Sequence, residues 1–282
     1  MIMKKIILLF VVIICFTSCK FQKIVKNNDW RVRYKAAIVY YEDKKDFSKA
    51  GILLEELIPI LKGSPEGEKA QFYFAYCNYQ QGQYLLSSHY FKTFFDTYNR
   101  SEFAEEAYYM HAYSLYADSP PIYLDQSSTN TAIDAFQEFL NRYPKSKYSV
   151  QSNNIIKEMR DKLEIKAFNT AKLYYKLQRF KSATIAFENF QKDFPDSDLQ
   201  EEAAFLRISA QFDMAKKSYE HKKKERFEAT IKFYQNFIDK YNESRFLKQA
   251  EVMFADSQKE LQRIAKTEKS ETSNGNTTLS QK

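Results

Sequence analysis

Five segments of the sequence repeat one pattern of side chains without a gap, and this repeat restricts the fold more than any other feature. In each segment a small residue stands three positions after the start, and large apolar residues stand seven, ten and fourteen positions after it. These offsets lie on one face of an α-helix, so each segment is expected to be a helix buried along one side. The segments begin at Phe47, Tyr84, Thr129, Phe180 and Phe227.

A serine stands seventeen positions after the start of every segment, where its side chain can cap the helix that follows. A second helical stretch precedes the segments, so each repeat is expected to be a helical hairpin. A hairpin with apolar faces on both helices must stack on its neighbours to bury them. The sequence therefore predicts an all-α solenoid of five hairpins. The capping serines are Ser64, Ser101, Ser146, Ser197 and Ser244.

Two segments and a final helix complete the expected domain, residues 30–266. A proline-containing loop, residues 117–128, replaces the tight turn of the third repeat. Residues 148–177 are predicted to form one long helix, and residues 245–266 an amphipathic helix that caps the solenoid. The polar residues 267–282 are expected to be a disordered tail.

Composition supports a helical body without the usual nucleotide-binding loops. The chain has 5 Gly in 282 residues, too few for glycine-rich phosphate loops or a hairpin-rich β fold. Its formal charge of +7 is spread along the chain, which argues against nucleic acid as a partner. The only basic cluster surrounds Lys223 and Arg226, and we weigh a solvated helix end there against a docking patch for an anionic partner.

The N-terminus predicts export and lipid attachment. A short basic stretch precedes eleven apolar residues, 6–16, which is the layout of a signal peptide and too short to span a bilayer. The sequence Phe16-Thr17-Ser18-Cys19 resembles the bacterial lipobox, which implies cleavage after residue 18 and a covalent lipid such as palmitate on Cys19. Residues 19–29 are then a lipidated linker. A simple secreted protein and an uncleaved anchor are the alternatives.

No pattern in the chain indicates catalysis or a bound cofactor. The motifs HExxH, CxxC, GxSxG and Walker A are absent from the sequence. His89 and His111 could approach each other, but the sequence offers no third ligand, so we predict no metal site. Cys77 is expected to be a small buried side chain. We therefore predict a protein that is not an enzyme and has no cofactor besides the lipid.

Six aromatic residues share three positions of the first helix in the second and third repeats. These positions, eight, twelve and fifteen after the capping serine, are called the groove positions below. The interpretation as a peptide-binding groove competes with packing between helices, because Tyr73 and Tyr108 could occupy the same side. The six residues are Phe72, Tyr76, Tyr79, Tyr109, Tyr113 and Tyr116.

The repeats resemble the tetratricopeptide repeat, through the small residue followed by an aromatic one four positions later and through Pro144 and Pro195 after the second helix. Together with the lipobox and the long helix, residues 132–146 and 171–197 resemble the BamD family of outer-membrane β-barrel assembly lipoproteins. That resemblance implies a scaffold on the periplasmic face of the outer membrane. Its implied partners are a BamA-like barrel insertase, other assembly lipoproteins and unfolded outer-membrane protein precursors.

The resemblance also implies a division of labour, with the insertase docked on the C-terminal repeats and precursors recognised by the N-terminal ones. Residues 20–23 contain no acidic side chain. By resemblance to lipoproteins of the Bacteroidetes type, this implies retention on the periplasmic side. The alternative is a different tetratricopeptide lipoprotein, one that coordinates cell-wall synthesis or binds glycans.

Overall fold

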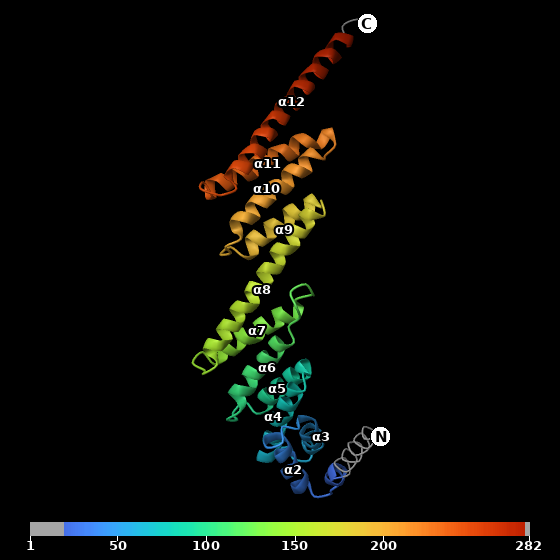
Figure 1. Cartoon of the computed structure of the whole chain (residues 1–282), viewed down its shortest axis with the longest axis vertical. Helices are drawn as coiled ribbons and strands as arrows, with labels where there is room; N and C mark the ends of the chain where they lie inside the picture. Colours follow the sequence, from blue (N-terminus) through green and yellow to red (C-terminus); the bar gives the residue numbers. More distant parts are fainter. Residues whose placement is uncertain (1–19, 280–282) are drawn as a thin grey trace, which may run out of the picture. The chain divides into compact units, whose positions relative to one another are not determined.

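The computed structural model of the chain describes the backbone of residues 20–279 and the side chains of residues 20–269. Every regular element within residues 20–279 is an α-helix (Figure 1). The expected signal peptide, residues 1–18, and Cys19 lie outside the described residues. None of the described helices has both the length and the apolar character needed to cross a bilayer.

The chain divides into two compact units, the first ending at Met159 and the second beginning at Arg160. In the first unit consecutive helices pack against each other: α2 (Trp30–Glu42), α3 (Phe47–Leu57), α4 (Pro65–Gln80), α5 (Tyr84–Thr97), α6 (Ala104–Ala117) and α7 (Ser127–Arg142). In the second unit the same holds for α9 (Phe180–Asp193), α10 (Gln200–Lys216), α11 (Glu220–Lys240) and α12 (Leu247–Leu279). The predicted long helix is α8 (Ser149–Lys176), which contributes residues to both units. The all-α hairpin fold is confirmed.

The repeated apolar face is the core of each hairpin. At the offsets of three, seven and ten the side chains are between 0 and 8 % exposed in all five repeats. The small residues at the offset of three, such as Ala132 and Ala183, let the paired helix approach closely. Burying one large apolar side chain contributes about 1.5 to 3 kcal/mol, so these positions dominate the stability of every repeat. The phenylalanines buried here are Phe91, Phe94, Phe136, Phe139, Phe187, Phe190 and Phe237.

The capping serines perform two tasks. Ser64 accepts a hydrogen bond from the backbone N–H of Gly67, and the other four accept one from the residue two positions on, as Ser146 does from Tyr148 at 3.0 Å. Each of those four also donates its hydroxyl to a glutamate on the first helix of the preceding hairpin. These pairs are Ser101 with Glu68, Ser146 with Glu105, Ser197 with Glu164 and Ser244 with Glu201.

The turns inside three hairpins place one residue in the left-handed region. Lys45, Gly82 and Gln178 each stand two residues before the second helix, with φ of 51°, 74° and 57°. Glycine adopts this conformation without a Cβ clash, whereas lysine and glutamine are strained there. Gln178 is held by Lys217, whose ammonium donates to its side-chain oxygen at 2.7 Å.

The loop of the third repeat matches the expectation from the sequence, whereas the C-terminal segment does not. The predicted loop of the third repeat is present at residues 118–126, and the Gln126 side chain closes it by donating to the carbonyls of Pro121 and Leu124 at 2.9 and 3.0 Å. The backbone of residues 267–279 is helical, unlike the expected disordered tail. Residues 247–274 contain neither Pro nor Gly, and Glu268 of α12 pairs with Lys224 of α11 at 3.1 Å, so nothing local ends the helix at 266.

Candidate functional site

Two of the six predicted groove aromatics belong to the core of the first unit. Phe72 and Tyr109 are each only 4 % exposed. The Phe72 ring stacks on Phe103 with centroids 4.7 Å apart, and the Tyr109 ring stacks on Tyr148 at 4.2 Å. For these two residues the predicted exposure in a groove is wrong, because aromatic rings from the following hairpin cover them.

Tyr76 is fixed by both its ring and its hydroxyl. Its ring meets Phe91 edge-on at 4.9 Å, and its hydroxyl donates to Glu106 at 2.5 Å. The other carboxylate oxygen of Glu106 accepts the Tyr148 hydroxyl at 3.1 Å. Burial, and next the bond to Glu106, raise the pKa of Tyr76 well above its ordinary value. Tyr76 is thus a half-buried packing residue with its polar end satisfied.

The remaining three tyrosines form a half-exposed ladder along α4 and α6. Tyr79 and Tyr113 have centroids 6.0 Å apart, and Tyr113 and Tyr116 are 5.7 Å apart. The Tyr116 hydroxyl reaches Glu158 of α8, at 3.0 and 3.1 Å from its two carboxylate oxygens. Burial raises the pKa of Tyr79 to about 12. These three are half-exposed side chains of the predicted groove set, and their role in binding a peptide stays a prediction.

The two tyrosines that could have competed for the groove pack elsewhere. Tyr73 stacks on Tyr41 at 4.0 Å and donates to Glu42 at 2.8 Å. Tyr108 stacks on Phe95 at 4.1 Å and donates to Glu138 at 3.0 Å. They fill the spaces between neighbouring hairpins, which leaves the ladder as a separate surface.

The groove positions of α10, in the second unit, are Phe205, Ser209 and Phe212. All three line a cavity of about 390 Å³, together with residues of α8 and α12. The middle position is Ser209 in α10, where α4 has Tyr76 and α6 has Tyr113. Phe205 and Phe212 are nevertheless buried, each 8 % exposed, and the Phe205 ring stacks on Phe246 at 4.6 Å, so the second unit has packed rings with a cavity beside them.

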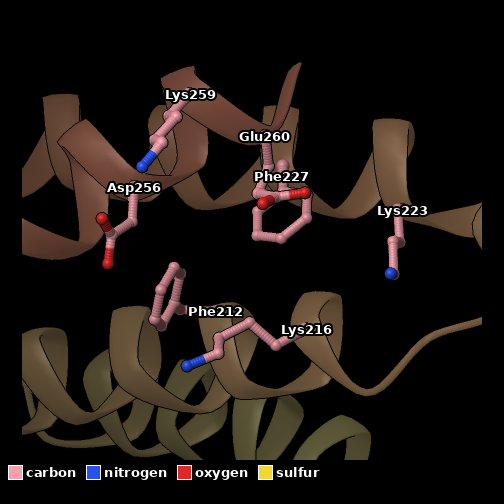
Figure 2. Close-up of a pocket in the computed structure, with 7 residues that line it drawn as sticks. All are labelled: Phe212, Lys216, Lys223, Phe227, Asp256, Lys259 and Glu260. Carbon is pink, nitrogen blue, oxygen red and sulfur yellow. The ribbon is translucent and has the colours of Figure 1, made fainter. Parts of the chain in front are cut away.

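The predicted docking residues Lys223 and Arg226 lie on α11 with their charges engaged. The Lys223 ammonium is 2.6 Å from Glu220, and the Arg226 guanidinium donates to the Ser218 hydroxyl. Lys223 also lines a cavity of about 310 Å³ between α10, α11 and α12, where Figure 2 shows it at one end with Phe212 and Lys216 facing α12. The basic cluster has less uncompensated charge than its sequence implies.

His111 and Cys77 have structural roles. His111 bonds through Nδ1 to the hydroxyl of Ser88 at 2.8 Å, and burial lowers its pKa. Cys77 is fully buried, and this burial raises the pKa of its thiol to about 12, as expected of an unreactive side chain. Within the described part of the chain no three His, Cys, Asp or Glu residues come together as metal ligands.

The sequence alone did not predict the serine–glutamate bonds or a half-buried cation. The signal for the bonds was present, because Glu68, Glu105 and Glu201 each stand four residues after a capping serine. Arg207 of α10 pairs with Glu188 of α9 at 2.8 Å and lies 4.1 Å over the Phe233 ring of α11. No short spacing in the sequence links those three residues.

Comparisons with known proteins found a matching family, a curated relative and a solved structure. The family described as "YfiO: Outer membrane lipoprotein" matches residues 31–224. The chain is 25 % identical over 171 residues to the "Outer membrane protein assembly factor BamD" of Rickettsia prowazekii (strain Madrid E), covering 60 % of this chain and 67 % of that protein. A crystal structure of a Podospora anserina kinesin light chain with TPR-like repeats is 13 % identical, with a TM-score of 0.33, covering 81 % of this chain and 96 % of that one.

Proposed function

Since the chain belongs to the YfiO family of outer membrane lipoproteins, we propose that it is a scaffold of the β-barrel assembly machinery. The observation that carries the proposal is the family match over residues 31–224, which covers the first four hairpins apart from Trp30, and α10 of the fifth. The similar Rickettsia prowazekii protein is named an assembly factor, which supports the same role. In this role the protein performs no catalysis and holds its partners by its helical surfaces.

Attachment to the membrane is the first part of the proposal. Residues 1–18 are removed, Cys19 carries the lipid, and residues 20–29 link it to α2 on the periplasmic face of the outer membrane. A lipidated cysteine is the only strong anchor that the sequence offers, since the hydrophobic run of residues 6–16 is cleaved away. The variant Cys19→Ala is expected to leave the outer-membrane fraction, and unchanged fractionation would show that protein contacts alone retain the chain.

Two kinds of partner complete the proposal. A BamA-like insertase docks on the C-terminal repeats, where Lys223 and Arg226 lie, together with other lipoproteins of the machinery. Unfolded outer-membrane protein precursors bind the N-terminal repeats. The half-exposed ladder of Tyr79, Tyr113 and Tyr116 supports this second role, because neighbouring aromatic side chains present a large apolar area to a partner.

The experiment is affinity purification of the tagged full-length protein from detergent-solubilised membranes, followed by identification of what co-purifies. Recovery of a barrel insertase, reduced by Lys223→Glu with Arg226→Glu and retained by Lys62→Glu with Lys181→Glu, supports the proposal. Lys62, before α4, and Lys181, on α9, are exposed cations, and their double reversal is the charge-matched control. Recovery of cell-wall synthesis enzymes or glycan-binding proteins without an insertase would favour the alternative role and overturn this one.

A further inference from the structure

A cavity of about 310 Å³ lies between α9, α10 and α11, and it is called the α9–α11 cavity below. Its lining residues differ from those of the two cavities described above, which extend to α12. Side chains from all three helices and from the end of α11 line it. Those used below include Glu188, Lys192, Ala204, Arg207, Lys240 and Tyr241.

A single difference between two repeats accounts for the α9–α11 cavity. In the second repeat Gln71, seven residues after the capping serine, donates its side-chain amide to the Tyr98 hydroxyl at 2.9 Å. The fifth repeat has Tyr241 at the position of Tyr98, but Ala204 at the position of Gln71. Both Ala204 and Tyr241 line the cavity. The fifth repeat therefore has open space and an unpaired hydroxyl where the second repeat has a hydrogen bond.

The α9–α11 cavity brings together two buried hydrogen-bond donors that lack an acceptor. Among the described side chains, three buried nitrogen or oxygen atoms have no hydrogen-bond partner, and one of these is Nε of Arg33. The other two are Nε of Arg207 and the hydroxyl oxygen of Tyr241, and both side chains line this cavity. Leaving buried donors unpaired costs free energy, so a ligand that brings acceptor oxygens here recovers that cost.

The charges that line the α9–α11 cavity favour an anion. Glu188 accepts from Lys192 at 2.9 Å and from Arg207 at 2.8 Å, so one carboxylate serves two cations. Among the described residues Lys240 has no carboxylate within ion-pair distance, and its ammonium lies 5.3 Å over the Tyr241 ring. The lining therefore has three cations and one carboxylate. Two positive charges remain for a ligand to neutralise.

This donor set suits a phosphate group better than a carboxylate. A phosphate monoester carries close to two negative charges at neutral pH and three strong acceptor oxygens, whereas a carboxylate brings one charge and two oxygens. A guanidinium such as that of Arg207 matches phosphate geometry. The cavity also has room for an organic group, because ~300 Å³ is the lower end of small-molecule sites. Phe233, whose ring lies 4.1 Å from the Arg207 guanidinium carbon, supplies an apolar wall.

We propose that the α9–α11 cavity binds a phosphate monoester. The phosphoryl oxygens accept hydrogen bonds from Arg207, Lys240 and the Tyr241 hydroxyl, and the organic part of the ligand lies against Phe233. Glu188 holds the guanidinium in place through its ion pair with Arg207. This site uses other residues than the predicted docking cluster and the tyrosine ladder, and it does not depend on the assembly role proposed above.

The test is isothermal titration calorimetry of the purified full-length protein in a non-ionic detergent. The probe is phenyl phosphate at about pH 8, where its phosphate is mostly a dianion because the second pKa is ~6. Benzoate is the matched probe, since it has the same ring and a single carboxylate. We expect saturable binding of phenyl phosphate and at least about tenfold weaker binding of benzoate.

Variants then locate the site. Ala204→Gln places in the fifth repeat the side chain that fills this position in the second, and it should weaken phenyl phosphate by about tenfold or more. Lys192→Gln with Lys240→Gln should do the same by removing two charges. The control, Lys62→Gln with Lys248→Gln, removes two charges at exposed positions outside the cavity and should stay within about twofold. Thermal unfolding followed by circular dichroism verifies that each variant folds.

A pair of tyrosine variants separates a phosphate donor from a packing residue. Tyr241→Phe should weaken phenyl phosphate by about fivefold without lowering the melting temperature of the ligand-free protein, because it removes a hydroxyl that has no partner among the described residues. Tyr98→Phe, at the same position of the second repeat, loses the bond from Gln71. It should lower the melting temperature and leave phenyl phosphate binding within about twofold.

Any of four results would overturn the proposal: no saturable binding of phenyl phosphate, equal binding of benzoate, full binding by Ala204→Gln, or an equal loss in the cavity and control variants. Two further phosphate monoesters identify the source of the ligand. Dibutanoyl phosphatidic acid is a soluble lipid, and glycerol 3-phosphate is the same headgroup without acyl chains. Tighter binding of the first supports the proposal with a lipid headgroup as the ligand, and tighter binding of the second supports it with a soluble phosphate ester.

Discussion

In the first unit the groove positions of α4 and α6 hold six aromatic side chains, while the same positions of α10 in the second unit hold Phe205, Ser209 and Phe212. The six pack on one another and on α5, α7 and α8, with Phe72 and Tyr109 buried. Around α10 the same register lines cavities. One repeat pattern therefore supports two kinds of surface, because the core offsets fix the hairpin and leave the groove positions free to vary.

The largest expected effect tests whether the first unit is the more tightly packed of the two. Phe72→Ala should lower the free energy of unfolding by about 3 to 5 kcal/mol, since it removes a fully packed ring. Phe205→Ala, at the matched position of α10, should cost less, about 2 to 3 kcal/mol, because that ring stacks on Phe246 but also borders a cavity.

Urea unfolding measures both variants. Fluorescence of Trp30, the only tryptophan of the chain, reports the first unit, and far-ultraviolet circular dichroism reports all helices. Equal losses for Phe72→Ala and Phe205→Ala would remove the packing difference between the units. A larger loss for Phe205→Ala would reverse it.

Both units contain capping serines that bond to a glutamate of the preceding hairpin. Ser146→Ala in the first unit and Ser197→Ala in the second should each cost about 1 to 3 kcal/mol, because each removes a cap and a hydrogen bond to a glutamate. Ser182→Ala, on the exposed side of α9, should stay within about 0.5 kcal/mol. If either capping variant matched Ser182→Ala in urea unfolding, that serine–glutamate pair would contribute nothing.

The core and serine positions could be predicted from the sequence, whereas the burial of the groove positions could not. The buried offsets and the serines recur at fixed spacing, so helical periodicity alone located the core, the hairpins and α8. Burial of Phe72 and Tyr109 depends instead on Phe103 and Tyr148, which come from the following hairpin. Helical phase places a residue on a side of its helix, but it does not say what the next hairpin lays over that side.

The cavity between α10, α11 and α12 lay beyond sequence reasoning for the same reason. Its lysines come from α10 and α12, more than forty residues apart at Lys216 and Lys259, and their lack of carboxylate partners among the described residues is a property of the packed structure. The cluster at Lys223 and Arg226 was conspicuous in sequence, yet Glu220 and Ser218 engage it. Charge counted along the chain overestimates what a partner meets.

A smaller effect distinguishes the turns of the two units. Gly82→Ala in the first unit should cost about 1 kcal/mol, because φ of 74° is strained for a residue with a Cβ. Gln178→Gly, at the same turn position in the second unit, should relieve that strain but lose the bond to Lys217, for a net gain below about 1 kcal/mol. Thermal unfolding by calorimetry measures both, and destabilisation by Gln178→Gly would show that the Lys217 bond outweighs the strain.

The smallest effect is a difference at alkaline pH between the tyrosine ladder and the groove positions of α10. Tyr79 corresponds to Phe212, which cannot ionise, and burial raises the pKa of Tyr79 from about 10 to about 12. Folding thus favours the neutral phenol: this contribution is fully present below pH ~10 and is lost as the pH rises through about 12. Tyr79→Phe places in α4 the residue type that α10 has at Phe212. This variant should lose less stability than wild type as the pH rises from ~10 to ~12.

The expected difference is below about 1 kcal/mol, because the Tyr79 side chain is partly exposed and solvent screens it. Urea unfolding followed by Trp30 fluorescence measures it, with wild type and Tyr79→Phe compared below pH ~10 and at several values between ~10 and ~12. A gap that widens with pH supports a phenol held neutral by burial. Parallel curves would mean that the Tyr79 hydroxyl meets water in the folded protein, so that this rung of the ladder is as open as the cavity beside Phe212.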